Sequence, residues 1–243
     1  VSDSSLIQPS RTNFLDIKTK MSIHRSKKKE KYQLAICIPA YNYRLFLEEA
    51  IDSCLDGLNG QCQVVVLDNN SSDGTNELKR KYEKLKDIFW YKNDAVLDIQ
   101  DNWNKCVRYA DANWIKILQA DDRMKNGAIA GILKIIEGFE RDFIGHQMEY
   151  IDKQGKIIGK TLSYEKNGIP IHTRPDYGVS LKLKNIGRLR ECTGNLFKKQ
   201  IWEEIGGYKK DSRVTFDINF NIELLRRYEG TLIDECFTQL RRH

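Results

Sequence analysis

Short apolar strands alternate with helical patterns between residues 33 and 124, and this alternation constrains the fold more than any other feature. The hydrophobic pattern predicts strands at 34–38, 64–67, 88–91 and 114–118, and helices near 45–55, 78–85 and 101–109. Strands that alternate with helices form right-handed β-α-β units. The sequence therefore predicts an α/β fold, with a mostly parallel sheet and helices on both of its faces.

Polar residues follow three of these strands directly. They are Pro39 to Asn42 after the first strand, Asp68 to Asp73 after the second, and Asp121-Asp122 after the fourth. Ligands of open parallel sheets bind beyond the carboxyl ends of the strands, so these residues are expected to converge on one edge. Carboxylates without partners are costly to bury, and their oxygens suit Mg²⁺ or Mn²⁺.

Each polar segment also has a purely structural interpretation. Asp121 could cap a helix that starts near Asn126, with Asp122 solvated beside it. The segment from Asp68 to Gly74 could be only a turn. The joint spacing of the three segments favours a binding site.

The usual glycine-rich phosphate-binding loops are missing from the sequence. No G-x-G-x-x-G follows the first strand, and no G-x-x-x-x-G-K-[ST] occurs anywhere. A nucleotide site in this chain would therefore be built from side chains and a divalent ion.

Composition narrows the class of protein. The 243 residues, 40% of them hydrophobic, can bury a substantial core. No apolar run approaches the roughly 18 residues of a membrane span, and the start does not resemble a secretory signal. The six cysteines include no C-x-x-C pair, which favours reduced thiols and a cytoplasmic setting. The net charge of +6 indicates a surface that tolerates anions, and no nucleic-acid partner is expected.

Residues 1–32 differ from the rest of the chain. Ser, Thr and Lys dominate, and 25–29 is a basic run. We predict a flexible basic arm, which is either solvated or in contact with anionic lipid headgroups. Residues 33–243 are then expected to form a single domain.

Four segments together resemble the family 2 glycosyltransferases with the GT-A fold. They are Ile36-Cys37-Ile38-Pro39-Ala40-Tyr41-Asn42, Val65-Val66-Leu67-Asp68-Asn69-Asn70-Ser71-Ser72-Asp73-Gly74-Thr75, Asn102-Trp103-Asn104 and Leu118-Gln119-Ala120-Asp121-Asp122. The resemblance covers residues 33–124 in order and spacing, and continues more weakly through Gly194-Asn195-Leu196-Phe197 and Ile205-Gly206-Gly207-Tyr208. It implies a nucleotide-sugar-binding half, 33–124, and an acceptor-binding half, 125–243.

The resemblance also implies roles for single residues. The donor nucleotide would contact two groups of residues, the first being Pro39, Ala40, Tyr41 and Asn42, and the second Asp68, Asn70, Asp98, Asn104 and Asp121. Asp68 would accept a hydrogen bond from the base, which suits the N–H of uracil or thymine. Asp121 and Asp122 would bind ribose and a Mn²⁺ or Mg²⁺ ion, which bridges the diphosphate. For Asn104, helix packing is the alternative role.

An inverting transfer needs a base that deprotonates the acceptor hydroxyl. The family places this acid after a Gly-Gly-aromatic turn, and Asp217 fits that position, with Asp211 in reserve. On local grounds alone Asp217 could equally be an ordinary acid of a helix N-terminus. Two departures from the family pattern stand out: Gln119 replaces the first acid of Asp-x-Asp, and Phe216 replaces the acid that often precedes the base.

The second half is less informative. The pattern predicts a helix over 129–139, a hairpin over 148–158 and a helix from 218. The polar stretch 159–190 is expected to be a lid or acceptor loop, in which His172, Arg174 and Arg188 or Arg190 contact anionic groups or solvent. Residues 224–227 could begin a basic patch for membrane lipids.

We therefore expect a metal-dependent inverting glycosyltransferase that uses a UDP-linked sugar. Its acceptor would be a glycan or lipid-linked glycan of bacterial surface synthesis, with possible peripheral contact at the inner face of the membrane. Two rival hypotheses are a catalytically inactive nucleotide-sugar-binding module and a nucleotidyltransferase.

Overall fold

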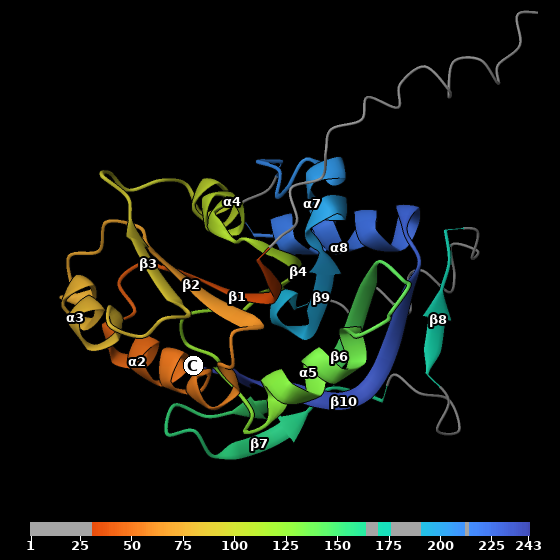
Figure 1. Cartoon of the computed structure of the whole chain (residues 1–243), viewed down its shortest axis with the longest axis horizontal. Helices are drawn as coiled ribbons and strands as arrows, with labels where there is room; N and C mark the ends of the chain where they lie inside the picture. Colours follow the sequence, from red (N-terminus) through yellow and green to blue (C-terminus); the bar gives the residue numbers. More distant parts are fainter. Residues whose placement is uncertain (1–30, 164–169, 176–190, 212–213) are drawn as a thin grey trace, which may run out of the picture.

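The computed structural model describes residues 31–163, 170–175, 191–211 and 214–243 of the chain (Figure 1). The predictions for most of the basic arm, for much of the loop 159–190, and for Arg188 and Arg190 lie outside these residues.

Within the described residues, ten strands form one sheet, in the order β3-β2-β1-β4-β9-β6-β10-β5, with β7 beside β6 and β8 beside β10. The strands are β1 (Tyr32–Ala40), β2 (Cys62–Asp68), β3 (Ile88–Lys92), β4 (Ala112–Ile117), β5 (Arg123–Met124), β6 (Phe143–Ile151), β7 (Ile157–Lys160), β8 (Ile171–Thr173), β9 (Asn195–Lys198) and β10 (Gly230–Arg241).

The first four strands confirm the predicted β-α-β arrangement. β1 lies between β2 and β4 and is parallel to both, while β3 continues the parallel run beside β2. In this register Ala40 pairs with Asp68, and Cys37 pairs with Ile117. The polar segments after β1, β2 and β4 therefore leave the sheet at the same edge.

Helices cover both faces of the sheet, as predicted. They are α2 (Arg44–Asp52), η1 (Leu55–Gly57), η2 (Thr75–Leu78), α3 (Lys79–Tyr82), α4 (Ile99–Tyr109), α5 (Ala128–Ile136), η3 (Cys192–Gly194), α7 (Lys199–Ile205) and α8 (Phe216–Arg227). Figure 1 shows α2, α3 and α5 on one face, with α4, α7 and α8 on the other. Alternate residues of β1 divide between the two faces: Ile36 belongs to one apolar cluster and Cys37 to the other.

The second half joins the same sheet through strands that the sequence did not predict. β9 is antiparallel to both β4 and β6, and therefore connects the two halves of the sheet. β10 runs parallel to β6 and antiparallel to β5 and β8. Because β10 spans the sheet beside the Asp121-Asp122 loop, it brings the last residues of the chain to that loop.

Two predictions from composition concern covalent state and membranes. None of the six cysteines is paired in a disulfide, and five of them are buried; the reduced state stays a prediction. None of the described helices has the length and apolar character needed to cross a membrane.

Candidate active site

A cleft of about 420 Å³ opens at the edge of the sheet where β1, β2 and β4 end. It is lined by Pro39, Ala40, Tyr41, Tyr43, Asn69, Val96, Leu97, Asp98, Ile99, Gln100, Asn102, Trp103, Gln119, Ala120 and Asp121. Five of the residues predicted to bind the donor are among these: Pro39, Ala40, Tyr41, Asp98 and Asp121. The cleft combines exposed aromatic rings with a few polar groups, as ligand sites usually do.

Asp68 lies at the end of β2 and is completely buried. Its Oδ1 atom accepts a hydrogen bond from the Ser71 N–H at 2.9 Å. Its Oδ2 atom has no hydrogen-bond partner among the described residues, although it is buried as well. A buried carboxylate oxygen without a partner is costly, so it is a candidate acceptor for a ligand N–H.

Asn42 and Asn70 adopt left-handed backbone conformations, with φ of 56° and 57°. The side-chain oxygen of Asn42 accepts a hydrogen bond from the Ser72 N–H, and the main-chain N–H of Asn42 donates to the Ser71 hydroxyl. Asparagine tolerates this conformation better than most residues, which explains its place at both turns. Asn42 therefore joins the loops that follow β1 and β2. The predicted contacts of Asn42 and Asn70 with the donor stay predictions.

A network of asparagines fixes the wall of the cleft opposite β1. Asn69 bonds both main-chain groups of Leu97, donating to its carbonyl and accepting from its N–H, each at 2.9 Å. The amide of Asn93 then links Asn69 to Asn102, at 2.8 and 2.9 Å. The segment of Val96 to Ile99 is therefore held against the cleft by side chains that are almost fully buried.

Asp98 and Asn104 both connect α4 to the turn after α7. Asp98 pairs with Lys210 at 3.1 Å on the surface. The Asn104 amide accepts the Tyr208 N–H and donates to the Tyr208 carbonyl, both at 2.8 Å. The packing role considered for Asn104 accounts for these bonds. Contact of Asp98 or Asn104 with a nucleotide stays a prediction.

Asp121 faces the cleft beside a histidine that the sequence interpretation missed. The His243 Nε2 atom lies 2.8 Å from the Asp121 Oδ2 atom, and the histidine side chain is 40% exposed. The His243 ring packs edge-on against Phe46 of α2, with centroids 5.4 Å apart. A carboxylate and an imidazole therefore meet at the rim of the cleft. No local signal in the sequence connects these residues, which lie 122 positions apart.

Asp122 has a different environment from its neighbour. Its side chain is buried, and its Oδ1 atom accepts the main-chain N–H of Arg241 at 2.9 Å. Burial, followed by the nearby charge of Asp121, raises the pKa of the Asp122 carboxyl to about 8. The alternative that Asp121 caps a helix is wrong, because Gly127 occupies the N-cap of α5.

Asp121 and Asp122 are the two residues predicted to bind a metal ion. Within the described ranges, no group of three or more His, Cys, Asp or Glu side chains is placed to hold an ion. The structure brings His243 to Asp121 and directs one Asp122 oxygen to the main chain of β10. The assignment of metal ligands stays a prediction.

Asp217 lies in the first turn of α8. Burial raises the pKa of its carboxyl, and the nearby charge of Glu191 adds to this effect. The main-chain N–H groups of Ile218 and Cys192 act in the opposite direction. Gln119 at the cleft donates to the Cys192 Sγ atom at 3.6 Å, so Cys192 links the cleft to Asp217. The reserve candidate Asp211 instead lines a separate hollow of about 280 Å³ beside α7 and α8.

Comparisons with known proteins agree with this architecture. Residues 35–206 match the sequence profile described as Glycosyl transferase family 2. A relative from Campylobacter jejuni, a GalNAc(5)-diNAcBac-PP-undecaprenol beta-1,3-glucosyltransferase, is 27% identical over 128 residues, which are 51% of this chain and 40% of that protein.

Two solved structures share the fold. Staphylococcus aureus TarS 1-349 in complex with UDP-GlcNAc superimposes with a TM-score of 0.72 at 13% identity, covering 87% of this chain and 59% of that one. The mannosyltransferase PcManGT from Pyrobaculum calidifontis, in complex with GDP-Man and Mn²⁺, gives 0.57 at 15% identity and covers 86% and 57%. This chain spans less than two thirds of the length of each of these three proteins.

The TarS likeness confirms the expected GT-A fold. Because the family profile matches well over half of the residues, the chain belongs to glycosyl transferase family 2.

Proposed function

We propose that this glycosyltransferase moves a sugar from a UDP-linked donor to a hydroxyl group of a glycan or lipid-linked glycan, with inversion at the anomeric carbon. The observation that carries the proposal is the meeting of Asp121 and His243 at the rim of the cleft. Gln119 of the same loop is joined through Cys192 to Asp217. A candidate ion-binding pair at the rim of the cleft is thus connected to a partly buried candidate base.

The base and ribose of the donor would occupy the part of the cleft beside Pro39, Ala40 and Tyr41. Tyr41 is 45% exposed, so its ring is available to stack against a base. The unpartnered Asp68 Oδ2 would accept the N3–H of uracil. This N–H is a donor that a carboxylate can recognise, which favours UDP. TarS, which shares the fold, has been solved with UDP-GlcNAc.

The residues at the rim fit a divalent cation. Asp121 offers a carboxylate and His243 an imidazole, and their facing atoms are 2.8 Å apart. Two such ligands leave room for water and diphosphate oxygens, the usual surroundings of Mg²⁺ and Mn²⁺ in nucleotide sites. When bound, the ion would neutralise the charge that develops on the leaving diphosphate. The structure favours Asp121 over Asp122 as the direct ligand, because Asp122 is buried against Arg241.

Asp217 would act as the base. Its carboxylate would accept the proton of the acceptor hydroxyl while that oxygen forms a bond to the anomeric carbon and the bond to the UDP oxygen breaks. The raised pKa of Asp217 suits this role, because it strengthens the carboxylate as a base. Partial burial also keeps Asp217 away from bulk water.

The C. jejuni relative is named for a lipid-linked glycan acceptor, which supports an acceptor of that class here. A cytoplasmic location with peripheral contact at the inner membrane face would give access to such an acceptor.

A panel of nucleotide sugars tests the proposal. We expect the purified chain to release UDP slowly from a UDP-sugar when Mn²⁺ is present. Addition of EDTA should stop this release. D217N should lower turnover by about 10²-fold or more while it leaves donor affinity unchanged. D121N combined with H243A should abolish the stimulation by Mn²⁺.

The same panel separates the rival hypotheses. Donor binding without turnover by the wild type would identify an inactive binding module, for which Gln119 in place of the first motif acid is the relevant departure. Membership of the glycosyltransferase family argues against a nucleotidyltransferase. Absence of binding to every nucleotide sugar would overturn the proposal.

A further inference from the structure

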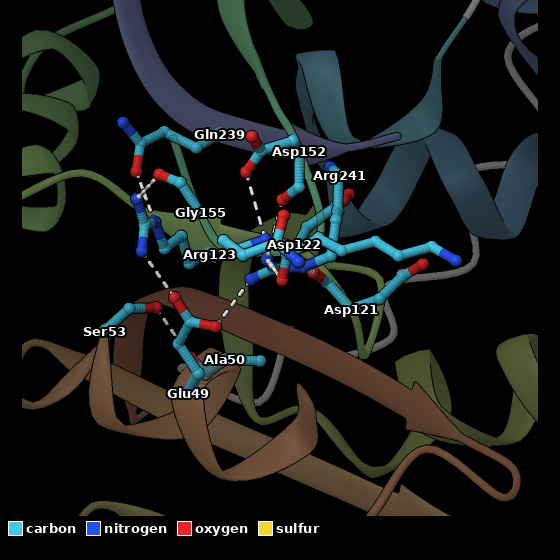
Figure 2. Close-up of polar contacts among 12 residues, drawn as sticks. Glu49, Ala50, Ser53, Asp121, Asp122, Arg123, Asp152, Gly155, Gln239 and Arg241 are labelled. Carbon is cyan, nitrogen blue, oxygen red and sulfur yellow. Dashed lines mark hydrogen bonds and ion pairs between the residues drawn. The ribbon is translucent and has the colours of Figure 1, made fainter. Parts of the chain in front are cut away.

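Arg241, the last residue of β10, has an almost completely enclosed charged side chain, with 1% of it exposed. Figure 2 shows its guanidinium group among residues from three other parts of the chain. Its Nε atom donates to the Asp121 carbonyl at 2.9 Å, and its Nη1 atom donates to the carbonyls of Asp152 and Lys153, both at 3.0 Å. Its Nη2 atom forms an ion pair with Glu49 of α2.

The main chain of Arg241 holds the second residue of the acidic loop. Its N–H donates to the Asp122 Oδ1 atom at 2.9 Å. Arg241 therefore bonds to Asp121 through its guanidinium group and to Asp122 through its main-chain N–H. The donor to the Asp121 carbonyl is a charged guanidinium, and hydrogen bonds that involve a charged group are stronger than those between neutral ones.

The same residue also sets the position of His243. His243 follows Arg241 by two residues, and its imidazole meets the Asp121 side chain at 2.8 Å. Phe46 contacts both: the Arg241 guanidinium lies over its ring at 4.8 Å from the centroid, and the His243 ring packs at 5.4 Å. Arg241 and His243 therefore pack against the same ring, that of Phe46.

We infer that Arg241 is a positioning residue that fixes the separation and direction of the Asp121 carboxylate and the His243 imidazole for a divalent cation. The inference rests on the proposed function, which supplies the cation. Arg241 itself would not be a ligand of the ion, because its guanidinium donors are directed to main-chain carbonyls and Glu49. Residues that orient metal ligands in this way contribute strongly to affinity.

Lysine should not replace Arg241. A guanidinium is planar and has five donors in a fixed fork, which here reaches three carbonyls and one carboxylate in different directions. An ammonium is a compact charge with three donors and cannot span the same set of acceptors. R241K therefore keeps the charge but loses the geometry.

Arg123 provides a matched control from the same cluster. Its guanidinium also pairs with Glu49 and also donates to a carbonyl of the β6–β7 turn, that of Gly155, at 2.8 Å. Its remaining partner is Gln239. R123K should therefore disturb the cluster to a similar degree without releasing the Asp121 carbonyl or the Asp122 carboxyl.

The test measures Mn²⁺ affinity by titration calorimetry in the presence of saturating UDP, together with the melting temperature of each variant. We expect R241K to weaken Mn²⁺ binding about 10- to 100-fold. R123K should lower the melting temperature with less than about a threefold change in affinity. Affinity for UDP without metal should be the same in R241K and the wild type, because the cleft beside β1 is unchanged.

Each outcome decides between the alternatives. If R241K lowers the melting temperature but leaves Mn²⁺ affinity as it is, Arg241 is only structural and the inference is overturned. Should R241K fail to fold, E49A carries the test, since it removes the carboxylate that pairs with the guanidinium and leaves its three carbonyl acceptors in place. Mn²⁺ affinity in E49A equal to that of the wild type would then overturn the inference. If the wild type binds neither Mn²⁺ nor UDP, the proposed function fails instead, which is a separate result.

Discussion

The ammonium nitrogen of Lys116 lies 2.9 Å from the Nε2 atom of His146, and both side chains are fully buried between β4 and β6. The His146 Nδ1 atom is 2.8 Å from the Gln147 carbonyl, which can only accept, so Nδ1 carries the proton. Nε2 is then the acceptor, and Lys116 donates to it. Lys116 also donates to the Thr193 carbonyl at 2.6 Å, so the pair supports η3, the turn next to Asp217.

Lys116 should give the protein a distinctive dependence of stability on pH. Burial lowers the pKa of Lys116 from 10.5 to about 7. Between pH 7 and 10.5 the unfolded chain binds more protons at this residue than the folded protein, so the free energy of unfolding should rise with pH, by at most about 1.4 kcal/mol per pH unit. Urea unfolding of the wild type and K116M between pH 7.5 and 9.5 measures this.

The K116M variant keeps most of the side-chain volume, but its free energy of unfolding should not show this rise with pH. Above pH 10.5, where Lys116 is uncharged in both the folded and the unfolded protein, we expect K116M to be destabilised by about 1–3 kcal/mol, because the Thr193 carbonyl loses its buried donor. K134M is the control, since Lys134 lies on the exposed side of α5. An identical slope in the wild type and K116M would contradict the prediction.

Asp122 should have the opposite effect on stability. Its pKa of about 8 in the folded protein, against an ordinary value of 3.8, means that the folded protein binds more protons between these pH values. Its contribution to stability therefore falls as the pH rises from about 4 to 8. D122N keeps an oxygen for the Arg241 N–H and has no charge to bury. We expect D122N to gain stability over the wild type as pH rises from 5 to 7.

The measurement is the free energy of unfolding of D122N and the wild type at several pH values in that range. The difference should grow by at most about 1.4 kcal/mol per pH unit. D94N, which alters an exposed carboxylate, serves as the control. A difference that is constant over the range would show that Asp122 is ionised in the folded protein throughout.

Alanine substitutions at Gly206 and Gly207 should separate two costs to the free energy of unfolding, that of backbone strain and that of side-chain crowding. Both have left-handed φ values, 87° and 72°. A Cβ atom at Gly206 would meet nothing within 4 Å, whereas one at Gly207 would come within 2.5 Å of the Asn104 amide oxygen. We expect G206A to cost about 1–2 kcal/mol from the backbone alone. G207A should cost about 1–3 kcal/mol more, because it displaces the Asn104 amide from Tyr208.

A double-mutant cycle checks the cause. In the N104A background the clash with Asn104 is absent, and only the tight approach to the Trp202 Cζ2 atom at 3.0 Å remains, so the cost of G207A should fall toward that of G206A in the wild type. Denaturant unfolding of the wild type and the four variants gives the required free energies. Equal costs for G206A and G207A in the wild type would contradict the proposed crowding at Asn104.

The parts of the fold that could be predicted are those whose partners are close in sequence. β1, β2 and β4 are continuous apolar runs that are almost fully buried, and each adjoins a helix with a clear period. β10 escaped prediction because Asp234 and Glu235 interrupt its apolar pattern. Its burial comes from pairing with β6, which begins more than 80 residues earlier.

In the candidate site, too, the residues that could be predicted are those whose neighbours are close in the sequence. The cleft residues Pro39, Ala40 and Tyr41 lie at the carboxyl end of β1, so their place at the sheet edge could be inferred from the order of the β-α-β units. The different environments of Asp121 and Asp122 depend on β10, and local sequence contains no information about it. For the same reason His243 and Arg241 could not be assigned, although they are the nearest partners of that loop.

Asp217 leads to the final prediction, which concerns the pH dependence of activity and rests on its proposed role as base. Burial raises the pKa of Asp217, and Glu191 adds a further increase through its charge. The acid limb of kcat/KM, which reports groups of the free enzyme, should therefore lie at a higher pH than that of an ordinary carboxyl. E191Q removes the neighbouring negative charge, so we expect it to shift this limb to lower pH.

The measurement is kcat/KM for UDP release between pH 4.5 and 8 for the wild type, E191Q and E229Q. Glu229 is an exposed acid beyond the other end of α8, so E229Q should leave the limb where it is in the wild type. A general loss of stability would lower kcat/KM at every pH without moving the limb. If E191Q and E229Q shift the limb equally, or neither moves it, the titrating group is not Asp217 and the base must be sought elsewhere in the cleft.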